Sequence, residues 1–157
     1  VEANMVEADL RGARMEGANL INARMGGATL IGAQMDGAVL ALSRLEGADF
    51  TSASLHGAAL RDVDFEGVEI DQDQLINAFG DGSVSLPEDW DWPSHWPREV
   101  LDKETYFGRW RGWRERCGMP WPVPGRALSL LDGIPASGIR AVPFELPDGY
   151  KCRDDVR

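Results

Sequence analysis

Large apolar residues recur at every fifth position through the first half of the chain. From Met5 to Ile70 these positions hold Met, Leu, Phe or Ile in fourteen consecutive units, with no insertion. Two residues before each of them stands a small residue, alanine in eleven units, and two residues after it stands glycine in eight. This strict five-residue pattern predicts one repeated local structure over the whole segment.

A five-residue period does not fit either of the ordinary secondary structures. Residues five apart on a helix differ by about 140° around the axis, so they form no apolar stripe. Along a strand the side chains alternate between faces, and an odd period would point successive apolar residues in opposite directions. The pattern is consistent if the chain turns a corner once in five residues. Four right-angle corners then close one coil, and coils stack at the strand spacing of roughly 4.8 Å.

Individual units carry a resemblance to a known family. Ala8-Asp9-Leu10-Arg11-Gly12, Ala18-Asn19-Leu20 and Ala48-Asp49-Phe50 resemble the units of pentapeptide-repeat proteins. The resemblance covers residues 3–72 and implies an all-β fold, a right-handed four-sided parallel β-helix of about 3.5 coils. The alternative is a disordered segment rich in Ala and Gly, but disorder would not require an apolar residue at fixed positions.

Three segments are expected along the chain: the β-helix over residues 1–72, a capping and Trp-rich segment over 73–121, and an extended Pro- and Gly-rich arm over 122–157. Full repeat register is expected to end at Gln72. The segment Gln74–Gly80 reads as a short helical turn that plugs the open end of the coil. A second helix is expected over Arg98–Cys117, with an apolar stripe that runs from Val100 to Cys117.

Other features of the sequence bear on boundaries and location. Val1 is already in repeat register with no cap before it, so we expect further residues upstream. The sequence contains no run of eighteen apolar residues, so it predicts no membrane-spanning helix. Cys117 and Cys152 form no CxxC motif; two reduced thiols are expected, and one disulfide is the alternative. The expected location is the cytoplasm or the periphery of a membrane complex.

Four repeats per coil would stack residues that are twenty positions apart. This places Arg24 over Arg44 on one face, with Glu46 and Glu66 in the neighbouring column. Two like charges at the strand spacing are tolerated when they are solvated or flanked by carboxylates. A solvated charge ladder is the favoured interpretation, and a grip for an anion or carboxylate is the alternative.

A different face breaks the rule that outward positions are polar. The unit Ala38–Leu42 carries apolar residues at its outward positions and lacks the corner glycine, and exposed apolar patches usually mark contact surfaces. The contact could be made by a protein partner, by a second copy of the chain or by the chain's own tail. The candidate partner-binding residues on this face and on the tail helix are Ile21, Val39, Ala41, Leu42, Trp110 and Trp113.

Charge narrows the classes of partner. Sixteen basic and twenty-six acidic residues give a net charge of −10, which disfavours direct contact with nucleic acid. Arginines around the tail helix are expected to dock it on the acidic coil or on a partner. Acidic residues gather around the last coil, namely Asp49, Asp62, Asp64, Glu66, Glu69 and Asp71. The family resemblance gives this surface an alternative role, because some members modulate DNA gyrase by presenting a DNA-like acidic surface.

No arrangement of residues predicts catalysis. The sequence contains no combination of nucleophile, base and orienting residue, no phosphate-binding loop and no metal-ligand cluster. We therefore expect no enzymatic activity, no catalytic residue, no metal and no cofactor. The predicted function is a protein–protein interaction or scaffold module, either self-associating or a subunit of a larger assembly.

Overall fold

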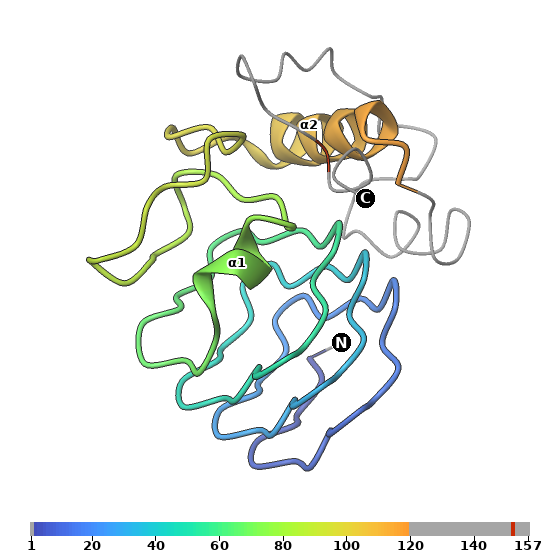
Figure 1. Cartoon of the computed structure of the whole chain (residues 1–157), viewed down its shortest axis with the longest axis vertical. Helices are drawn as coiled ribbons and strands as arrows, with labels where there is room; N and C mark the ends of the chain where they lie inside the picture. The colour runs from blue at the N-terminus through green and yellow to red at the C-terminus, as the bar shows by residue number, and fades with distance from the viewer. Residues whose placement is uncertain (1, 120–151, 153–157) are drawn as a thin grey trace.

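The structure is a computed structural model that describes residues 2–119 and Cys152. The arm expected over residues 122–157 lies outside the described residues apart from Cys152. Two helices lie within these described residues, α1 (Gln72–Leu75) and α2 (Lys103–Arg116). The segment before α1 forms a stack of coils, and α2 lies across one side of that stack (Figure 1).

Residues twenty positions apart pair in parallel in most of the coil, which confirms the prediction of four units per turn. One column of bridges joins Asn4, Arg24 and Arg44, and another joins Asn19, Val39, Ala59 and Phe79. The pairing is made by backbone hydrogen bonds, such as that from the amide of Met25 to the carbonyl of Arg44 at 2.8 Å. The bridges are isolated because each side of the coil is only a few residues long.

The large apolar residues at every fifth position, called beat residues below, fill the interior of the coil. Met25, Leu30, Met35 and Leu40 are fully buried, and so are the alanines two positions before them. Burial of one such side chain stabilises a fold by roughly 1.5–3 kcal/mol, and the small alanine leaves room for it at the corner. The inward pattern of the sequence therefore accounts for the core of the coil.

The corners of the coil require an unusual backbone conformation. Every position two residues after a beat residue, from Glu7 to Gly67, has a φ between 52° and 74°. Glycine adopts this left-handed conformation without strain, which explains its frequency there. Five corners carry other residues, and among them Leu42, with a φ of 60°, is the one large aliphatic side chain: Glu7, Asn22, Leu42, Ser52 and Asp62.

Repeat register continues beyond Gln72, so the predicted end was too early. Leu75 is buried in the coil core, Phe79 pairs with Ala59 twenty positions earlier, and Ser85 pairs with Asp64 twenty-one positions earlier. Gly80 stands at the beat position, and a Cβ there would lie 2.7 Å from the ring of Trp96. The Trp96 ring thus supplies the apolar group that the glycine lacks.

The predicted plug over Gln74–Gly80 was also placed wrongly. The helical turn is α1, which begins after Asp71 with reciprocal Asp71–Gln74 capping bonds and belongs to the last coil. The residues that pack onto the end of the coil core come later in the chain: Val84, Leu86, Trp90, Trp92 and Trp96.

The tail helix α2 is shorter than the predicted Arg98–Cys117. Asp102 caps its first turn, because its carboxylate accepts a hydrogen bond from the amide of Thr105 at 2.9 Å. Val100 lies before this cap and is 65% exposed, so it is not part of the buried stripe. The helix ends at Arg116 with Cys117 as its cap residue, and Gly118 follows in the left-handed conformation.

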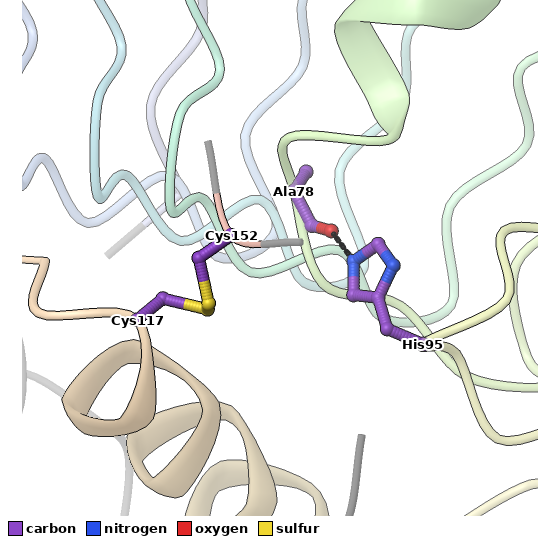
Figure 2. The surroundings of a disulfide bond; sticks show 4 residues. All are labelled: Ala78, His95, Cys117 and Cys152. Atoms are coloured by element: carbon purple, nitrogen blue, oxygen red, sulfur yellow. Dashed lines mark hydrogen bonds between the residues drawn. A yellow bond between two sulfur atoms is a disulfide. The ribbon is translucent and has the colours of Figure 1, made fainter. Parts of the chain in front are cut away.

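Cys117 and Cys152 form a disulfide, so the expectation of two reduced thiols was wrong (Figure 2). The bond joins the end of α2 to a residue 35 positions later. Both cysteines are buried in the cluster that packs α2 on the coil.

Candidate partner-binding surface

The apolar face of the coil is covered by α2. Val39 and Ala41 lie in one buried cluster with Tyr106, Trp110 and Trp113, and each of these side chains is at most 4% exposed. The sequence left open whether this face meets a partner or the chain's own tail, and in the structure it meets the tail.

The six candidate partner-binding residues are therefore separated by the fold. Val39, Ala41, Trp110 and Trp113 are buried against one another, and Ile21 is partly buried at the edge of their cluster. Leu42 is 47% exposed. Of the predicted set, Leu42 is the residue that the structure presents to solvent as a large apolar surface.

Polar contacts fix α2 on the coil through backbone carbonyls. Trp110 Nε1 donates to the carbonyl of Gly57 at 2.9 Å, and the Arg114 guanidinium donates to the same oxygen at 2.6 Å. The Tyr106 hydroxyl lies 2.8 Å from the carbonyl oxygens of Leu60 and Phe79. These contacts use neutral acceptors, so the expected docking of basic residues on acidic side chains does not describe them.

Burial changes the ionisation of two groups at this junction. It lowers the pKa of Arg114 to about 10, against an opposing effect of Asp36. It also lowers the pKa of His95 to about 4, although a hydrogen bond from Nε2 to the carbonyl of Ala78 at 2.7 Å favours the charged form (Figure 2). The His95 ring stacks on Trp113 with 5.1 Å between centroids. His95 thus belongs to the packing of the tail.

A groove of about 630 Å³ lies on the face that carries the stacked arginines. Arg24 and Arg44 pair through their backbones in adjacent coils, and both side chains are exposed. Within residues 2–119 and Cys152, neither guanidinium makes a hydrogen bond or an ion pair. The groove is lined by Glu2, Asn22, Arg24, Leu42, Ser43, Arg44, Leu45, Glu46, Asp62, Asp64 and Glu66.

Charge changes sign along this groove. Arg24 and Arg44 pair in adjacent coils, whereas Asp64, twenty positions after Arg44, pairs with Ser85, and no bridge between Arg44 and Asp64 is found among the described residues. Asp62 and Glu66 flank Asp64 on the chain and line the same groove. Leu42 lies at the corner of the coil that carries Arg44. The groove therefore combines an arginine pair, an acidic end and an exposed leucine.

The six predicted acidic-face residues are all at least partly exposed. Asp62 forms an ion pair with Arg61 at 3.1 Å, and Asp49 accepts hydrogen bonds from Thr51 that lower the pKa of Asp49. Three of the six, Asp62, Asp64 and Glu66, line the groove that also contains Arg24 and Arg44, called the arginine groove below. The sequence indicated the columns but not the groove.

The described residues show no alternative centre based on a metal. Among residues 2–119 and Cys152 there is no group of three or more His, Cys, Asp or Glu side chains that could hold a metal ion.

Comparison with known families identifies the coil. A family model described as "Pentapeptide repeats", which contains eight copies of the repeat, matches residues 3–41 and 30–67. Residues 3–67 belong to the pentapeptide-repeat family. The pentapeptide-repeat segment ends before α1, so α2 and the residues that close the coil lie outside the match.

Solved structures of pentapeptide-repeat proteins are similar to this chain. Rfr23 from the cyanobacterium Cyanothece 51142 is 26% identical with a TM-score of 0.45, over 57% of this chain and 58% of Rfr23. A thylakoid-lumen protein from Arabidopsis thaliana is 16% identical with a TM-score of 0.36, over 68% and 74% of the two chains. QnrB1, a plasmid-mediated fluoroquinolone resistance protein, is 20% identical with a TM-score of 0.38, over 54% and 38%. A comparison with curated proteins found no match.

Proposed function

We propose that this chain is a non-enzymatic scaffold that presents the arginine groove and Leu42 to a protein partner within a larger assembly. Its pentapeptide-repeat coil supplies a rigid surface, and α2 covers the apolar face that would otherwise be exposed. The observation that carries the proposal is Leu42, because its position is unfavourable for folding alone.

Leu42 opposes the stability of the coil in two ways. A left-handed backbone at a residue other than glycine costs roughly 1 kcal/mol, and eight other corners avoid this cost by using glycine. The side chain is also 47% exposed, so it gains only part of the stabilisation that burial would give. A partner that covers Leu42 would bury this apolar surface. The exposed guanidinium groups of Arg24 and Arg44 beside it offer that partner hydrogen-bond donors.

Site-specific photo-crosslinking in the native cell tests the proposal. A photo-reactive amino acid at position 42 is expected to give a discrete adduct with one protein. The matched control is the same amino acid at position 31, where Ile31 is 38% exposed on another face. An adduct at 42 and none at 31 supports the scaffold role. No adduct at 42, or equal adducts at both positions, contradicts it.

The alternative function is modulation of DNA gyrase by an acidic, DNA-like surface. The exposure of Asp64, Glu66, Glu69 and Asp71 at the last coils supports it, and the continued register to Ser85 makes the coil longer than the sequence indicated. Arg24 and Arg44 weaken it, because they interrupt the acidic surface. A supercoiling assay in which a large excess of the protein has no effect would remove this alternative.

The compartment is also a proposal. Within the part of the chain that the structure describes, no helix has the length and apolarity needed to cross a bilayer. The Cys117–Cys152 bond favours an oxidising compartment, because disulfides persist mainly there. This argues against the expected cytoplasmic location. Thiol labelling of the protein taken directly from its cell distinguishes the two, since a cytoplasmic protein would show two reactive thiols.

A further inference from the structure

We propose that one side of the coil contains an unpaired seam, which receives an arginine side chain of the protein partner. The seam is formed by the facing backbone edges of residues 43–47 and 63–67, and both edges contribute to the lining of the arginine groove. The partner's guanidinium enters from the groove and donates hydrogen bonds to backbone carbonyls of the seam. This inference rests on the proposed function and specifies the chemistry of the contact.

The seam lacks the backbone hydrogen bonds that join neighbouring layers elsewhere in the coil. One layer earlier, the same side is fully paired, for example from the amide of Met25 to the carbonyl of Arg44 at 2.8 Å. Within the described part of the chain, the three equivalent bonds of the next layer are absent. They would run from amide to carbonyl between Leu45 and Asp64, between Asp64 and Ser43, and between Gly47 and Glu66.

The layers on either side of the seam stay bonded. Before it, the amide of Leu42 donates to the carbonyl of Arg61 at 2.8 Å, and after it, the amide of Phe50 donates to the carbonyl of Glu69 at 2.7 Å. An inserted strand would need twice the layer spacing of roughly 4.8 Å, which these bonded flanks do not allow. A single side chain is therefore the group that fits the seam.

Elsewhere the protein satisfies coil carbonyls with side chains from other segments. Gln74 Nε2 donates to the carbonyls of Phe50 and Ala53, both at 2.8 Å, where α1 interrupts the next layer. The buried Arg114 guanidinium donates to the carbonyl of Gly57 at 2.6 Å. No described side chain does the same for the carbonyls of the seam, and backbone groups without a protein partner are left for water or a ligand.

The charge of the groove favours a cation at the seam. Its lining holds two guanidinium groups and five carboxylates, a net charge of −3. Glu46 and Glu66 are exposed and form no ion pair with any described residue. A guanidinium is a planar group that carries five N–H donors and no acceptor, so it can serve carbonyls of both edges while the carboxylates offset its charge. A lysine ammonium is more strongly hydrated and less suited to this position.

Leu42 adds an apolar contact to the same site. It lies next to the first residue of the seam, lines the same groove and is 47% exposed. The aliphatic stem of an arginine packs readily on apolar surface while its charged end reaches a polar group. One arginine side chain would therefore cover Leu42 and satisfy the seam together.

Amide exchange in the free protein tests whether the seam exists. The amides of Leu45 and Gly47 are expected to exchange with solvent at least tenfold faster than those of Met25 and Gly27, which occupy the same places one layer earlier and are hydrogen-bonded. Exchange rates of individual amides in the full chain, measured by NMR, make this comparison within one molecule.

Titration with blocked tripeptides tests the ligand. The probes are Ala-Arg-Ala, Ala-Lys-Ala and Ala-citrulline-Ala, in which citrulline keeps the shape of arginine but carries no charge. At roughly 50 mM salt, where screening is weak, Ala-Arg-Ala is expected to bind about tenfold more tightly than the other two. Its binding should shift the amide resonances of Leu45, Gly47 and Asp64.

Substitutions in the groove locate the effect. Glu46→Gln with Glu66→Gln should lower the affinity for Ala-Arg-Ala at least fivefold. The matched control is Glu69→Gln with Glu88→Gln, which removes the same charge at two exposed positions outside the groove and should leave the affinity unchanged. Circular dichroism of both variants checks that the coil is intact.

Three results would overturn the inference: slow exchange of Leu45 and Gly47, equal binding of the arginine and citrulline probes, or equal losses of affinity in the groove variant and its control. These results leave the scaffold proposal standing if the adduct at position 42 is still formed. Absence of that adduct contradicts the scaffold proposal itself, even where Ala-Arg-Ala binds the seam.

Discussion

The coil and the tail bury their apolar side chains in different ways. In the coil, each buried residue repeats the contacts made twenty positions earlier, and backbone bonds join one layer to the next. In the tail, each large aromatic has its own contact: Tyr106 with two carbonyls, Trp110 with Gly57, and Trp113 with His95. The coil is redundant, whereas the tail depends on individual residues.

This difference can be measured separately in the two regions. All six tryptophans lie between Trp90 and Trp121, so tryptophan fluorescence reports on the tail. Circular dichroism reports on the coil as well. Substitutions at the tail contacts are expected to shift the unfolding transition seen by tryptophan fluorescence more than the transition seen by circular dichroism.

The largest effect is expected from Gly57→Ala. A Cβ at Gly57 would meet the Arg114 guanidinium and lie 3.3 Å from Met119 Sδ, and Arg114 is 2% exposed. The strained φ and a displaced buried charge should together lower the free energy of unfolding by about 4 kcal/mol. Denaturation followed by fluorescence measures this loss.

The matched control is Gly67→Ala. Gly67 has the same φ of 74°, but a Cβ there meets nothing within 4 Å. It should cost about 1 kcal/mol, the backbone effect alone. Equal losses at both positions would show that α2 is not held by its contact with Gly57.

Removal of the disulfide should have the next largest effect. Cys152→Ser opens a loop of 35 residues, and loops of this length give a stabilisation of about 3–4 kcal/mol in the chain-entropy model. Fluorescence-detected denaturation should move to lower denaturant, and a reducing agent should move the wild type equally. A reductant that also destabilises Cys152→Ser would show that it acts elsewhere.

Acid should weaken the tail through His95. The pKa of His95 is lowered from 6.5 to about 4, so between these values the unfolded chain binds a proton that the folded chain does not. The free energy of unfolding therefore decreases as the pH falls from 6.5, by about 3 kcal/mol at pH 4, and His95 contributes no further change above pH 6.5. Fluorescence-detected denaturation across this range measures it.

His95→Gln provides the control for acid sensitivity. Its side-chain amide can still donate to the carbonyl of Ala78 but does not titrate in this range. This variant should lose most of the dependence between pH 4 and 6.5. A pH profile identical to that of the wild type would assign the dependence to other groups.

The smallest effect concerns the corner where the coil departs from its own rule. Leu42→Gly removes backbone strain and an exposed side chain, and should raise the free energy of unfolding by about 1 kcal/mol. Partner binding should weaken at the same time. Ser52→Gly relieves a corner with the same φ of 60° and should leave binding unchanged. Unchanged partner binding in Leu42→Gly would mean that the leucine serves no contact.

The end of the coil could be only partly predicted from the sequence. Leu75 stands at the next fifth position after Ile70, and Ala78 is the small residue two positions before Gly80, so both residues fit the repeat pattern. The register was nevertheless placed too short, because Asp73 replaces a small residue and Gly80 replaces an apolar one. The missing group comes from Trp96, sixteen residues later, and no local pattern links these two positions.

The sequence predicted which residues of the candidate site stack on one another, but it did not predict the shape of the site. Twenty-residue stacking placed Arg24 over Arg44, and the irregular unit drew attention to Leu42. The sequence did not decide that α2 would cover Val39 and Ala41 while leaving Leu42 exposed. That outcome depends on where the helix lies over the face, which follows from its contacts with Gly57 and Leu60.

The sequence by itself determined the coil, its four sides, its inward residues and the positions of its corners. These features depend on contacts that recur every five or twenty residues, so periodicity encodes them. Only the tertiary structure decided the cover over the apolar face, the aromatic closure of the coil end and the Cys117–Cys152 bond. Those contacts join segments that share no period, and their stability comes from matched shape and desolvated hydrogen bonds, which exist only after the coil has formed.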